Sequence, residues 1–366
     1  MSPLRILNLG AGGFIGSHLT QRLLAEGHIV TAVDLYSDKI GEYLEHPRLT
    51  FLRQDIRGDW NLEELVEGSD LVIDLIAHAN PGLYIRIPLD VFQLNFLENL
   101  KIAEACVRQG KHLIQFSTCE VYGRTAASLP HAGLTDREDP IHATFSEDSS
   151  EFILGPVNEH RWIYASAKQL LERVVHAYGL QEGFHYTIIR PFNFLGPKID
   201  FLPSDNQDGI PRVFSFFMDA LLTGAPLQLV NGGHQRRCYT HIEDAVECIY
   251  RIVINAGGVC DREIFNIGSP YNEVSIRGMA EMMRGIYGRR FATPGSPLSE
   301  IVELDGNTFY GEGYDDSDRR IPDIAKARTL LGWEPQWRLP ELLEATMEYH
   351  VEEFRRKRGE AAVPVG

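Results

Sequence analysis

The chain has 366 residues, of which 44% are hydrophobic and 23% are charged. This composition is ordinary for a globular protein large enough to form two domains, and it excludes wholesale disorder. The formal net charge of -16 argues against a nucleic-acid partner, because non-specific binding to phosphates requires a basic surface.

The cysteines are scattered along the chain, at Cys106, Cys119, Cys238, Cys248 and Cys260, with no CxxC pair and no zinc spacing. Such a set predicts free thiols in a reducing compartment and no metal site. No apolar run approaches the ~20 residues that a membrane-spanning helix needs, and the N-terminal residues lack the pattern of a signal peptide. We therefore expect a cytoplasmic protein that does not bind membranes.

Short apolar runs alternate with helical patterns in the first half of the chain. The predicted strands are Ile6–Leu9, Ile29–Val33, Leu49–Leu52, Leu71–Ile76, Leu113–Ser117 and Tyr186–Arg190. The predicted helices include Ile15–Glu26, Val91–Gln109 and Ala165–Tyr178. This alternation is typical of βαβ units, which build a parallel sheet covered by helices on both faces.

The pattern changes after Arg190, where closely spaced prolines and glycines interrupt any regular sheet. The segments His241–Ile254 and Ile264–Ile267 are expected to return to the first sheet. We predict a doubly wound α/β Rossmann domain of residues 1–190 plus about 238–268. Residues 191–237 and 269–358 are expected to form a smaller α/β substrate domain, with a frayed tail at 359–366.

A glycine-rich turn, G-x-x-G-x-x-G, joins the first predicted strand to the first helix. It contains Gly10, Gly13, Phe14, Ile15 and Gly16. Glycine permits both positive φ and close approach of a ligand to the backbone, and the N–H groups at a helix start favour anions. The turn is therefore predicted to bind the pyrophosphate of a dinucleotide.

Two acidic residues follow the next two strands. Asp34 ends the second strand, where a carboxylate accepts hydrogen bonds from adenosine ribose hydroxyls and repels a 2′-phosphate. This position favours NAD over NADP as the cofactor. Asp55, followed by Ile56, is placed to hold the adenine amino group. Alternatively, Asp34 and Asp55 are turn residues at strand ends.

Tyr164 and Lys168 form a Y-x-x-x-K pair in a predicted helix, where residues i and i+4 share one face. A fixed ammonium group nearby is expected to lower the pKa of the tyrosine from its usual ~10. Tyr164 would then act as a base toward a substrate hydroxyl while the nicotinamide accepts a hydride. Alone, this pattern is often structural, but here it follows a dinucleotide fingerprint.

These residues, with the segment Ser117–Gly123, resemble the extended short-chain dehydrogenase/reductase superfamily over nearly the whole chain. Within that superfamily, sugar-nucleotide 4,6-dehydratases have an Asp where this chain has Cys119, between Thr118 and Glu120. Simple 4-epimerases usually lack an acid at the position of Glu120. Decarboxylases of UDP-glucuronate typically have Thr-Ser-Glu there. The resemblance therefore favours a decarboxylase over a dehydratase.

The segment 156–164 resembles bacterial and plant UDP-glucuronate decarboxylases, and the segments 117–123, 209–213 and 310–323 resemble the UDP-apiose/UDP-xylose synthase family. The resemblance implies catalytic roles for Tyr164, Lys168, Thr118, Cys119, Glu120 and Arg161. It implies substrate contacts from Tyr84, Glu120, Arg161, Asn193, Arg212, Arg237, Tyr314 and Arg320. Arginines suit both the diphosphate and the carboxylate of such a substrate, because a guanidinium binds either group in bidentate fashion.

Two positions depart from this family. Ala79 stands where the plant members carry a second cysteine, and Gln228 stands where relatives have a lysine facing the nucleotide. The resemblance implies oxidation and decarboxylation of UDP-glucuronate with NAD, giving UDP-apiose, UDP-xylose or both. Production of UDP-xylose alone, release of a UDP-4-keto-pentose, and a non-catalytic NAD-binding regulator are the alternatives.

The resemblance also implies a homodimer, in which the helices Ala165–Tyr178 and Val91–Gln109 pack against those of a second copy. Apolar positions on both helices could serve that interface or the core of one chain. They are Leu97, Leu100, Ala103, Val107, Leu170, Leu171, Val174 and Val175.

Overall fold

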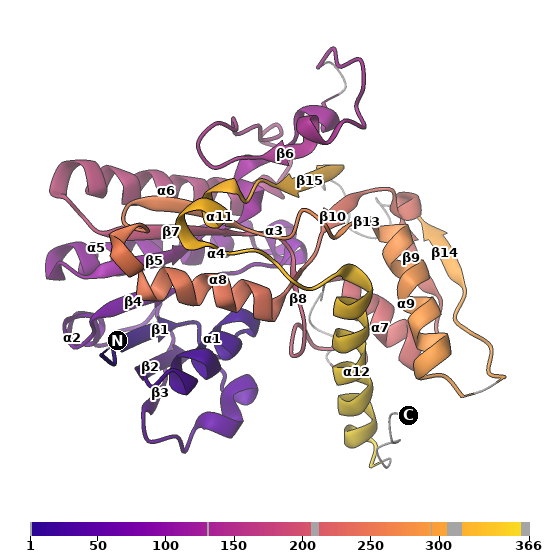
Figure 1. The fold of residues 1–366 in the computed structure, drawn as a ribbon, viewed down its shortest axis with the longest axis horizontal. Helices are drawn as coiled ribbons and strands as arrows, with labels where there is room; N and C mark the ends of the chain where they lie inside the picture. The colour runs from indigo at the N-terminus through magenta and orange to yellow at the C-terminus, as the bar shows by residue number, and fades with distance from the viewer. Residues whose placement is uncertain (1, 130–131, 206–211, 294, 306–316, 360–366) are drawn as a thin grey trace.

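The computed structural model describes residues 2–129, 132–205, 212–293, 295–305 and 317–359 (Figure 1). Its main sheet has seven strands, all parallel. In sheet order they are β3 (Leu49–Arg53), β2 (Ile29–Asp34), β1 (Arg5–Leu9), β4 (Leu71–Asp74), β5 (His112–Phe116), β7 (Tyr186–Pro191) and β12 (Glu263–Ile267). The order reverses at β1, so the predicted doubly wound Rossmann sheet is confirmed.

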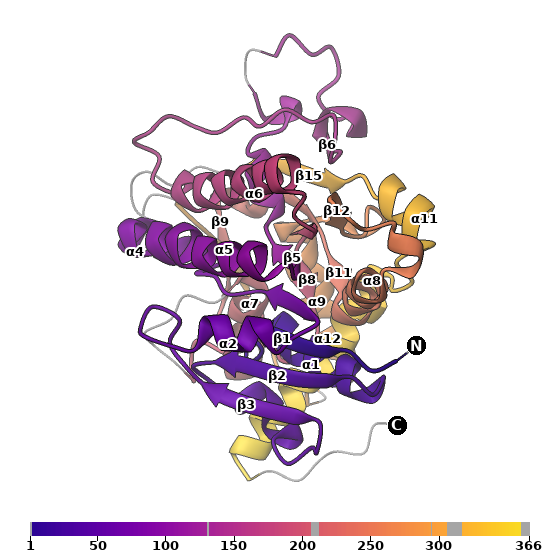
Figure 2. The same ribbon diagram turned by 90° about the vertical axis from the view of Figure 1, so that its left-hand side faces the viewer.

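Helices cover both faces of this sheet, because its strands carry apolar side chains on both sides. One face packs against α1 (Phe14–Ala25) and α8 (Ile242–Ile254), and α11 (Ala325–Leu331) lies beside α8 and β12. The other face packs against α2 (Leu62–Glu67), α5 (Asn99–Gln109) and α6 (Trp162–Glu182), and Figure 2 shows α5 and α6 side by side.

The later part of the chain forms a second group of elements at one end of the molecule (Figure 1). Helices α7 (Val213–Thr223), α9 (Ile276–Arg290) and α12 (Leu339–Lys357) pack together there, and their apolar residues continue the core around α1 and α8. The strands β9 (Leu227–Val230) and β14 (Ile301–Leu304) pair in parallel beside these helices. One core therefore extends through both halves of the chain.

A small four-stranded sheet and a two-stranded pair lie between these groups. The small sheet has the order β13 (Glu273–Ser275), β10 (Arg236–Cys238), β15 (Arg319–Pro322) and β6 (Thr144–Phe145). The pair consists of β8 (Phe194–Leu195) and β11 (Thr240–His241). Segments that are far apart in the sequence thus meet in one sheet. The division of the chain into two domains at the predicted boundaries stays a prediction.

The predicted helix Val91–Gln109 is not one regular α-helix in the structure. It consists of α4 (Pro88–Phe92), a π-helical stretch Gln93–Glu98 and α5, and a short helix α3 (Pro81–Arg86) precedes it. The wider π turn presents Asn95 to the loop after β4, where its amide exchanges two hydrogen bonds with the backbone of His78 at 2.8 and 3.1 Å. Hydrophobic spacing at a period of 3.6 cannot reveal such a turn.

Two other predicted boundaries shift. Strand β4 stops at Asp74 and not at Ile76, because the Asp74 carboxylate accepts the backbone N–H of Ile76 (3.0 Å) and turns the chain. Helix α6 is longer at both ends than the predicted Ala165–Tyr178. Among the described helices, none combines the length and the apolar composition that crossing a bilayer requires.

Candidate active site

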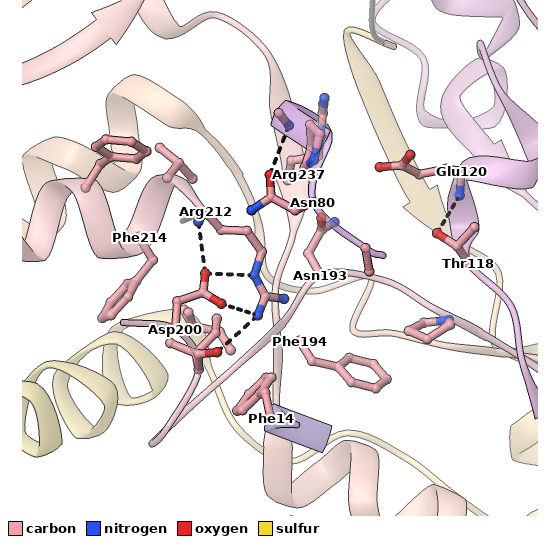
Figure 3. Close-up of a pocket in the computed structure, with 18 of the residues that line it drawn as sticks. Phe14, Asn80, Thr118, Glu120, Asn193, Phe194, Asp200, Arg212, Phe214 and Arg237 are labelled. Atoms are coloured by element: carbon pink, nitrogen blue, oxygen red, sulfur yellow. Dashed lines mark hydrogen bonds and ion pairs between the residues drawn. The ribbon is translucent and has the colours of Figure 1, made fainter. Parts of the chain in front are cut away.

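A cavity of about 780 Å³ opens at the carboxyl ends of the parallel strands, where ligands bind in open α/β sheets. Its walls come from the main sheet, from α6 and α7, and from the small sheet (Figure 3). The structure brings most of the predicted site residues together in this one space. They are Gly10, Gly13, Phe14, Ile15, Gly16, Tyr84, Thr118, Cys119, Glu120, Arg161, Tyr164, Lys168, Asn193, Arg212, Arg237 and Arg320.

The glycine-rich turn forms one end of the cavity. Gly10 has φ +85°, and a Cβ on Gly16 would lie 2.1 Å from the carbonyl oxygen of Gly10. The turn can therefore close only with glycine at these positions. The first turn of α1 contains no acidic residue, so its N–H groups and helix dipole face an anion without repulsion. This cradle fits a dinucleotide pyrophosphate.

The two acidic residues after β2 and β3 have different surroundings. Asp34 accepts hydrogen bonds from the backbone N–H groups of Gly12 (2.9 Å) and Tyr36 (3.1 Å), which fixes it beside the glycine turn. Asp55 instead binds the Arg57 guanidinium, whose hydrogen bonds lower the pKa of that carboxyl group. Asp34, Asp55 and the buried Ile56 do not line the described cavity, and their contacts with adenosine stay predictions.

Tyr164 and Lys168 lie one turn apart in α6 and face the cavity. The Tyr164 ring stacks on Tyr84, with centroids 4.6 Å apart and 9° between the planes. The Lys168 ammonium donates to the carbonyl oxygen of Phe116 at the end of β5 (3.0 Å). Only 4% of Tyr164 and 1% of Lys168 is exposed, so solvent contributes little to the ionisation of either group.

The pKa of Tyr164 contradicts one sequence expectation. Burial raises this pKa above its ordinary value, and the nearby Glu120 carboxylate raises it further, while Thr118 and Arg161 oppose the shift. We expected Lys168 to lower it. Burial instead lowers the pKa of Lys168 itself to about 8, because a low-dielectric site disfavours the ammonium form. The amino group therefore remains mostly protonated at neutral pH and loses its charge near pH 8.

Glu120 is the centre of a charged cluster near Tyr164 that also contains Arg161 and Arg320. Its carboxylate accepts two hydrogen bonds from Arg161, at 2.9 and 3.1 Å, and lies 3.9 Å from the Arg320 guanidinium. Both arginines are almost completely buried. Burial raises the pKa of the neighbouring Cys119 thiol, although Arg320 opposes the shift. Cys119 is therefore a protonated thiol at neutral pH.

Strand register places the arginines of the small sheet. In the β10–β15 pair, Arg237 lies opposite Arg320, and Arg236 lies opposite Arg319. Successive side chains point to opposite faces of a sheet, so Arg237 and Arg320 face the cavity while the other two face away. On that outer face, Glu273 forms a two-oxygen ion pair with Arg319 and lies 3.7 Å from Arg236.

Arg212 lies near the glycine turn, and Figure 3 shows its bidentate pairing with Asp200. Its Nε and Nη2 atoms donate to the Asp200 carboxylate at 3.0 and 2.9 Å, and its guanidinium lies 5.6 Å from the centroid of the Phe14 ring. The arginine predicted to bind the diphosphate is thus held by an acid that the sequence analysis did not single out. Asp200 stands three residues after Gly196-Pro197, in a loop-rich passage that has no hydrophobic periodicity to mark it.

Asn193 lines the cavity at φ +42°, a conformation that asparagine tolerates better than most residues, and its amide donates to the carbonyl oxygen of Cys238 (3.3 Å). Ala79 and Gln228, the two departures from the family pattern, also line it. Tyr314 and most of the two resembling segments at 209–213 and 310–323 lie outside the described residues. All five cysteines are buried and free, as expected from their spacing.

Comparison with known proteins agrees with this geometry. Residues 6–268 match the family described as the NAD dependent epimerase/dehydratase family. A UDP-D-apiose/UDP-D-xylose synthase of Oryza sativa subsp. japonica is 42% identical over 97% of this chain and 91% of its own length. UDP-D-apiose/UDP-D-xylose synthase 1 of Arabidopsis thaliana is 43% identical over 95% of this chain and 92% of its own.

Solved structures share the fold. The PbgP3 protein of Burkholderia pseudomallei superposes with a TM-score of 0.83 at 33% identity, covering 98% of this chain and 99% of that one. A UDP-glucuronic acid 4-epimerase of Bacillus cereus, solved with UDP-glucuronic acid and NAD, has a TM-score of 0.77 at 24% identity, covering 96% and 99%. With its cradle for a dinucleotide and its match over residues 6–268, this chain belongs to the NAD dependent epimerase/dehydratase family.

Proposed function

We propose that this protein is an NAD-dependent enzyme that oxidises and decarboxylates UDP-glucuronate, forming UDP-apiose and UDP-xylose. The observation that carries the proposal is the cluster of Arg161, Glu120 and Arg320 beside Tyr164, in a cavity that begins at a dinucleotide cradle. This cluster would bring arginines that can bind a carboxylate next to Tyr164, the acid–base residue. The apiose/xylose synthases of rice and Arabidopsis, similar over almost their whole length, support the same substrate.

When bound, NAD supplies a hydride acceptor at C4 of the sugar and later returns the hydride. Tyr164 removes the proton of the C4 hydroxyl, and the charge of Lys168 stabilises the phenolate that Tyr164 must form. Thr118, whose hydroxyl accepts the backbone N–H of Glu120 (3.2 Å), would hydrogen-bond the C4 oxygen. For UDP-apiose and UDP-xylose the net redox change of the sugar is zero, so NAD would be a retained catalyst in forming them, whereas each keto-pentose released would leave one NADH.

The C4 ketone is β to the C6 carboxylate, and a β-keto acid loses CO2 because the electron pair is delocalised onto the ketone as an enolate. Arg320 and Arg161 would engage the carboxylate, since a guanidinium binds such a group in bidentate fashion, and Arg161 would then share its donors between the substrate and Glu120. Arg212, Arg237 and Asn193 would bind the diphosphate and uridine. Glu120 and the protonated thiol of Cys119 are the candidates for returning a proton to the sugar.

The apiose branch requires opening of the C2–C3 bond and closure to a branched aldehyde, which the retained hydride then reduces. Ala79 cannot take part in the proton transfers of this branch, because it carries no ionisable group. These transfers must come from water, Glu120 or Cys119, and we expect UDP-xylose or keto-pentose as a substantial share of the product. Introducing A79C should shift the ratio toward apiose, and C119S should shift it away.

Production of UDP-xylose alone, or release of the UDP-4-keto-pentose, is the second proposal, and Ala79 is the feature that favours it. A non-catalytic NAD-binding regulator is a weaker alternative, because such a protein has no need of both Tyr164 and Lys168 at the cavity wall. Identification of the nucleotide sugars by NMR, after incubation with UDP-glucuronate and catalytic NAD, separates these cases. A branched sugar supports the first proposal, and its absence at every pH contradicts it.

A homodimer and a cytoplasmic location belong to the same proposal. Leu97, in the π-helical stretch before α5, and Leu170, in α6, are more than two-fifths exposed. By contrast, Leu171, Val175 and Ala103 are buried in the core. Exposed leucines on adjacent helices suit a helix-to-helix interface with a second copy. Sedimentation at micromolar concentration should give a dimer, and a monomer would contradict this.

A further inference from the structure

Asp74 is a charged residue at the centre of the main sheet that the proposed mechanism does not use. It ends β4 and has no exposed surface. Its two oxygens accept N–H groups, one from the Gln115 side chain at 2.9 Å and one from the Ile76 backbone at 3.0 Å. Donors at both oxygens favour the ionised form of a carboxyl group, against the burial that raises its pKa. A buried anion of this kind requires a nearby positive charge.

Lys168 supplies that charge. Asp74 lies opposite Gln115 in the β4–β5 register, and the next residue, Phe116, offers the carbonyl oxygen to which the Lys168 ammonium donates. Of the groups that oppose the effect of burial on the Lys168 pKa, Asp74 has the largest influence, and Glu172 follows. Conversely, burial raises the pKa of Asp74, and Lys168 is the first group that lowers it. The two side chains thus stabilise each other's charged forms.

Three other titratable groups face this pair from the described elements around it. Glu172 of α6 is bound by Arg190 at 3.0 and 2.6 Å, so its negative charge is largely offset. Cys106 of α5 is a neutral thiol, because burial and the nearby Asp74 raise its pKa. Tyr164, on the same face of α6, has a raised pKa and is a neutral phenol at pH 7. Asp74 is therefore the main anion acting on Lys168.

We propose that Asp74 is a positioning residue for the reaction, whose buried carboxylate keeps Lys168 protonated at neutral pH. This inference rests on the proposed function, in which the Lys168 ammonium stabilises the Tyr164 phenolate. Because residues i and i+4 share one helix face, the same ammonium would also bind the ribose of NAD beside Tyr164. Neutralising Asp74 should leave the cavity intact but cause Lys168 to lose its proton at a lower pH. An opposite charge within ~4–6 Å shifts a pKa by about 1–3 units. Because Asp74 and Lys168 make no direct ion pair in the described structure, the lower end of that range applies.

The test is the affinity for NAD as a function of pH, measured by calorimetry on the isolated enzyme without sugar nucleotide. Wild type should bind NAD more weakly above a transition near pH 8, where Lys168 loses its charge. K168M should lack this transition, and its loss would assign the transition to Lys168. D74N should move it down by about one pH unit. Q115L, which removes one donor from the carboxylate, should move it in the same direction by less.

D244N is the matched control. Asp244 is also a buried carboxylate with two backbone donors, Gln336 and Trp337, but it begins α8 on the opposite face of the sheet. Its variant should lose stability and keep the wild-type transition. If D74N and Q115L, folded by circular dichroism, both follow the wild-type profile, the proposal is wrong. It is also wrong if the transition persists in K168M, since the charge that NAD senses would then not be that of Lys168.

This readout is independent of turnover. An enzyme that binds NAD with the expected pH dependence but leaves UDP-glucuronate unchanged would contradict the proposed function and retain the role of Asp74. The reverse result, turnover with no shift in D74N, would contradict only the role of Asp74.

Discussion

At the scale of single residues, the proposed chemistry depends on side chains removed from water. Tyr164, Arg161, Arg320 and Lys168 are all less than 5% exposed. In such surroundings each electrostatic interaction or hydrogen bond is stronger than in solvent, and the loss of a partner costs more free energy. Substitutions here should alter chemistry or ligand choice far more than they alter packing.

The Tyr164→Phe variant removes one hydroxyl and keeps the stacked ring, so the packing on Tyr84 should persist. Turnover should fall by at least ~10²-fold, the usual contribution of a positioned acid–base group. NAD affinity and the melting temperature should stay near their wild-type values. Near-normal turnover in this variant would show that Tyr164 is not the base.

The Arg320→Ala variant tests the carboxylate contact. It should weaken binding of UDP-glucuronate much more than binding of UDP, because removing one partner of a buried charge pair typically costs ~3–5 kcal/mol. Arg319→Ala is the control, since that side chain points to the other face and should affect both ligands alike. Equal losses for the two ligands in Arg320→Ala would place this arginine on the diphosphate.

The sequence predicted which residues meet in the cavity better than it predicted how they are paired. The glycine turn, Tyr164 and Lys168 stand in motifs with fixed spacing, and spacing along one element survives folding. The Arg161–Glu120 pair and the Asp200 partner of Arg212 join segments that are 41 and 12 residues apart, and no local pattern encodes them. Asp74 did leave a signal, as a lone charge inside the apolar run Leu71–Ile76.

At the scale of elements, the register of β10 and β15 decides which arginines reach the substrate. A slip of β15 by one residue would turn Arg320 away from the cavity and Arg319 toward it. Like charges directly opposite each other destabilise a sheet, so the pairing needs an anion on each face. Glu273 supplies it on the outer face, and Glu120 lies near Arg320 on the inner one.

The Glu273→Gln variant should therefore destabilise the small sheet by about 1–3 kcal/mol, less than a fully buried pair because Glu273 is partly exposed. The KM for UDP-glucuronate should rise as Arg237 and Arg320 lose their support. Thermal unfolding and steady-state kinetics measure the two effects. Glu303→Gln, which breaks an exposed pair with Arg277, is the control and should change neither. An unchanged melting temperature in Glu273→Gln would contradict the role of the outer cluster.

Long periodic elements were predicted well, and short ones were not. The strands of the main sheet are apolar runs bounded by turns, and seven of them align in the expected parallel order. The short strands β6, β10, β13 and β15 contain two to four residues each and are defined by pairing across the chain. The π-helical turn at Gln93–Glu98 is likewise set by contacts of Asn95, which a periodicity argument does not include.

At the scale of the whole molecule, three histidines link stability to pH. Burial lowers the pKa of His112, His241 and His350 to about 4, well below the value of an unfolded chain. As the pH falls, these histidines take up a proton in the unfolded chain before they do so in the folded one. The stabilisation is therefore complete above about pH 6.5 and is lost as the pH falls toward 4. Each histidine contributes about 1.4 kcal/mol per pH unit within that window.

Urea unfolding between pH 7 and pH 5 should therefore show a steep loss of stability on the acid side. His350→Phe, which places another ring beside Phe214, should flatten the profile while leaving the neutral-pH stability nearly unchanged. A profile that is level from pH 7 to pH 5 in the wild type would show that these side chains are hydrated in solution.

The central claim is that NAD acts as a catalyst in removing the carboxylate of UDP-glucuronate. The most direct measurement uses substrate labelled with ¹³C at C6 and NAD at a small fraction of the substrate concentration, with ¹³C-bicarbonate followed by NMR. The account predicts that many equivalents of labelled bicarbonate appear for each NAD, with NADH absorbance no larger than any released keto-pentose accounts for. Label that stays in the sugar, or bicarbonate that stops at one equivalent per NAD, would contradict it.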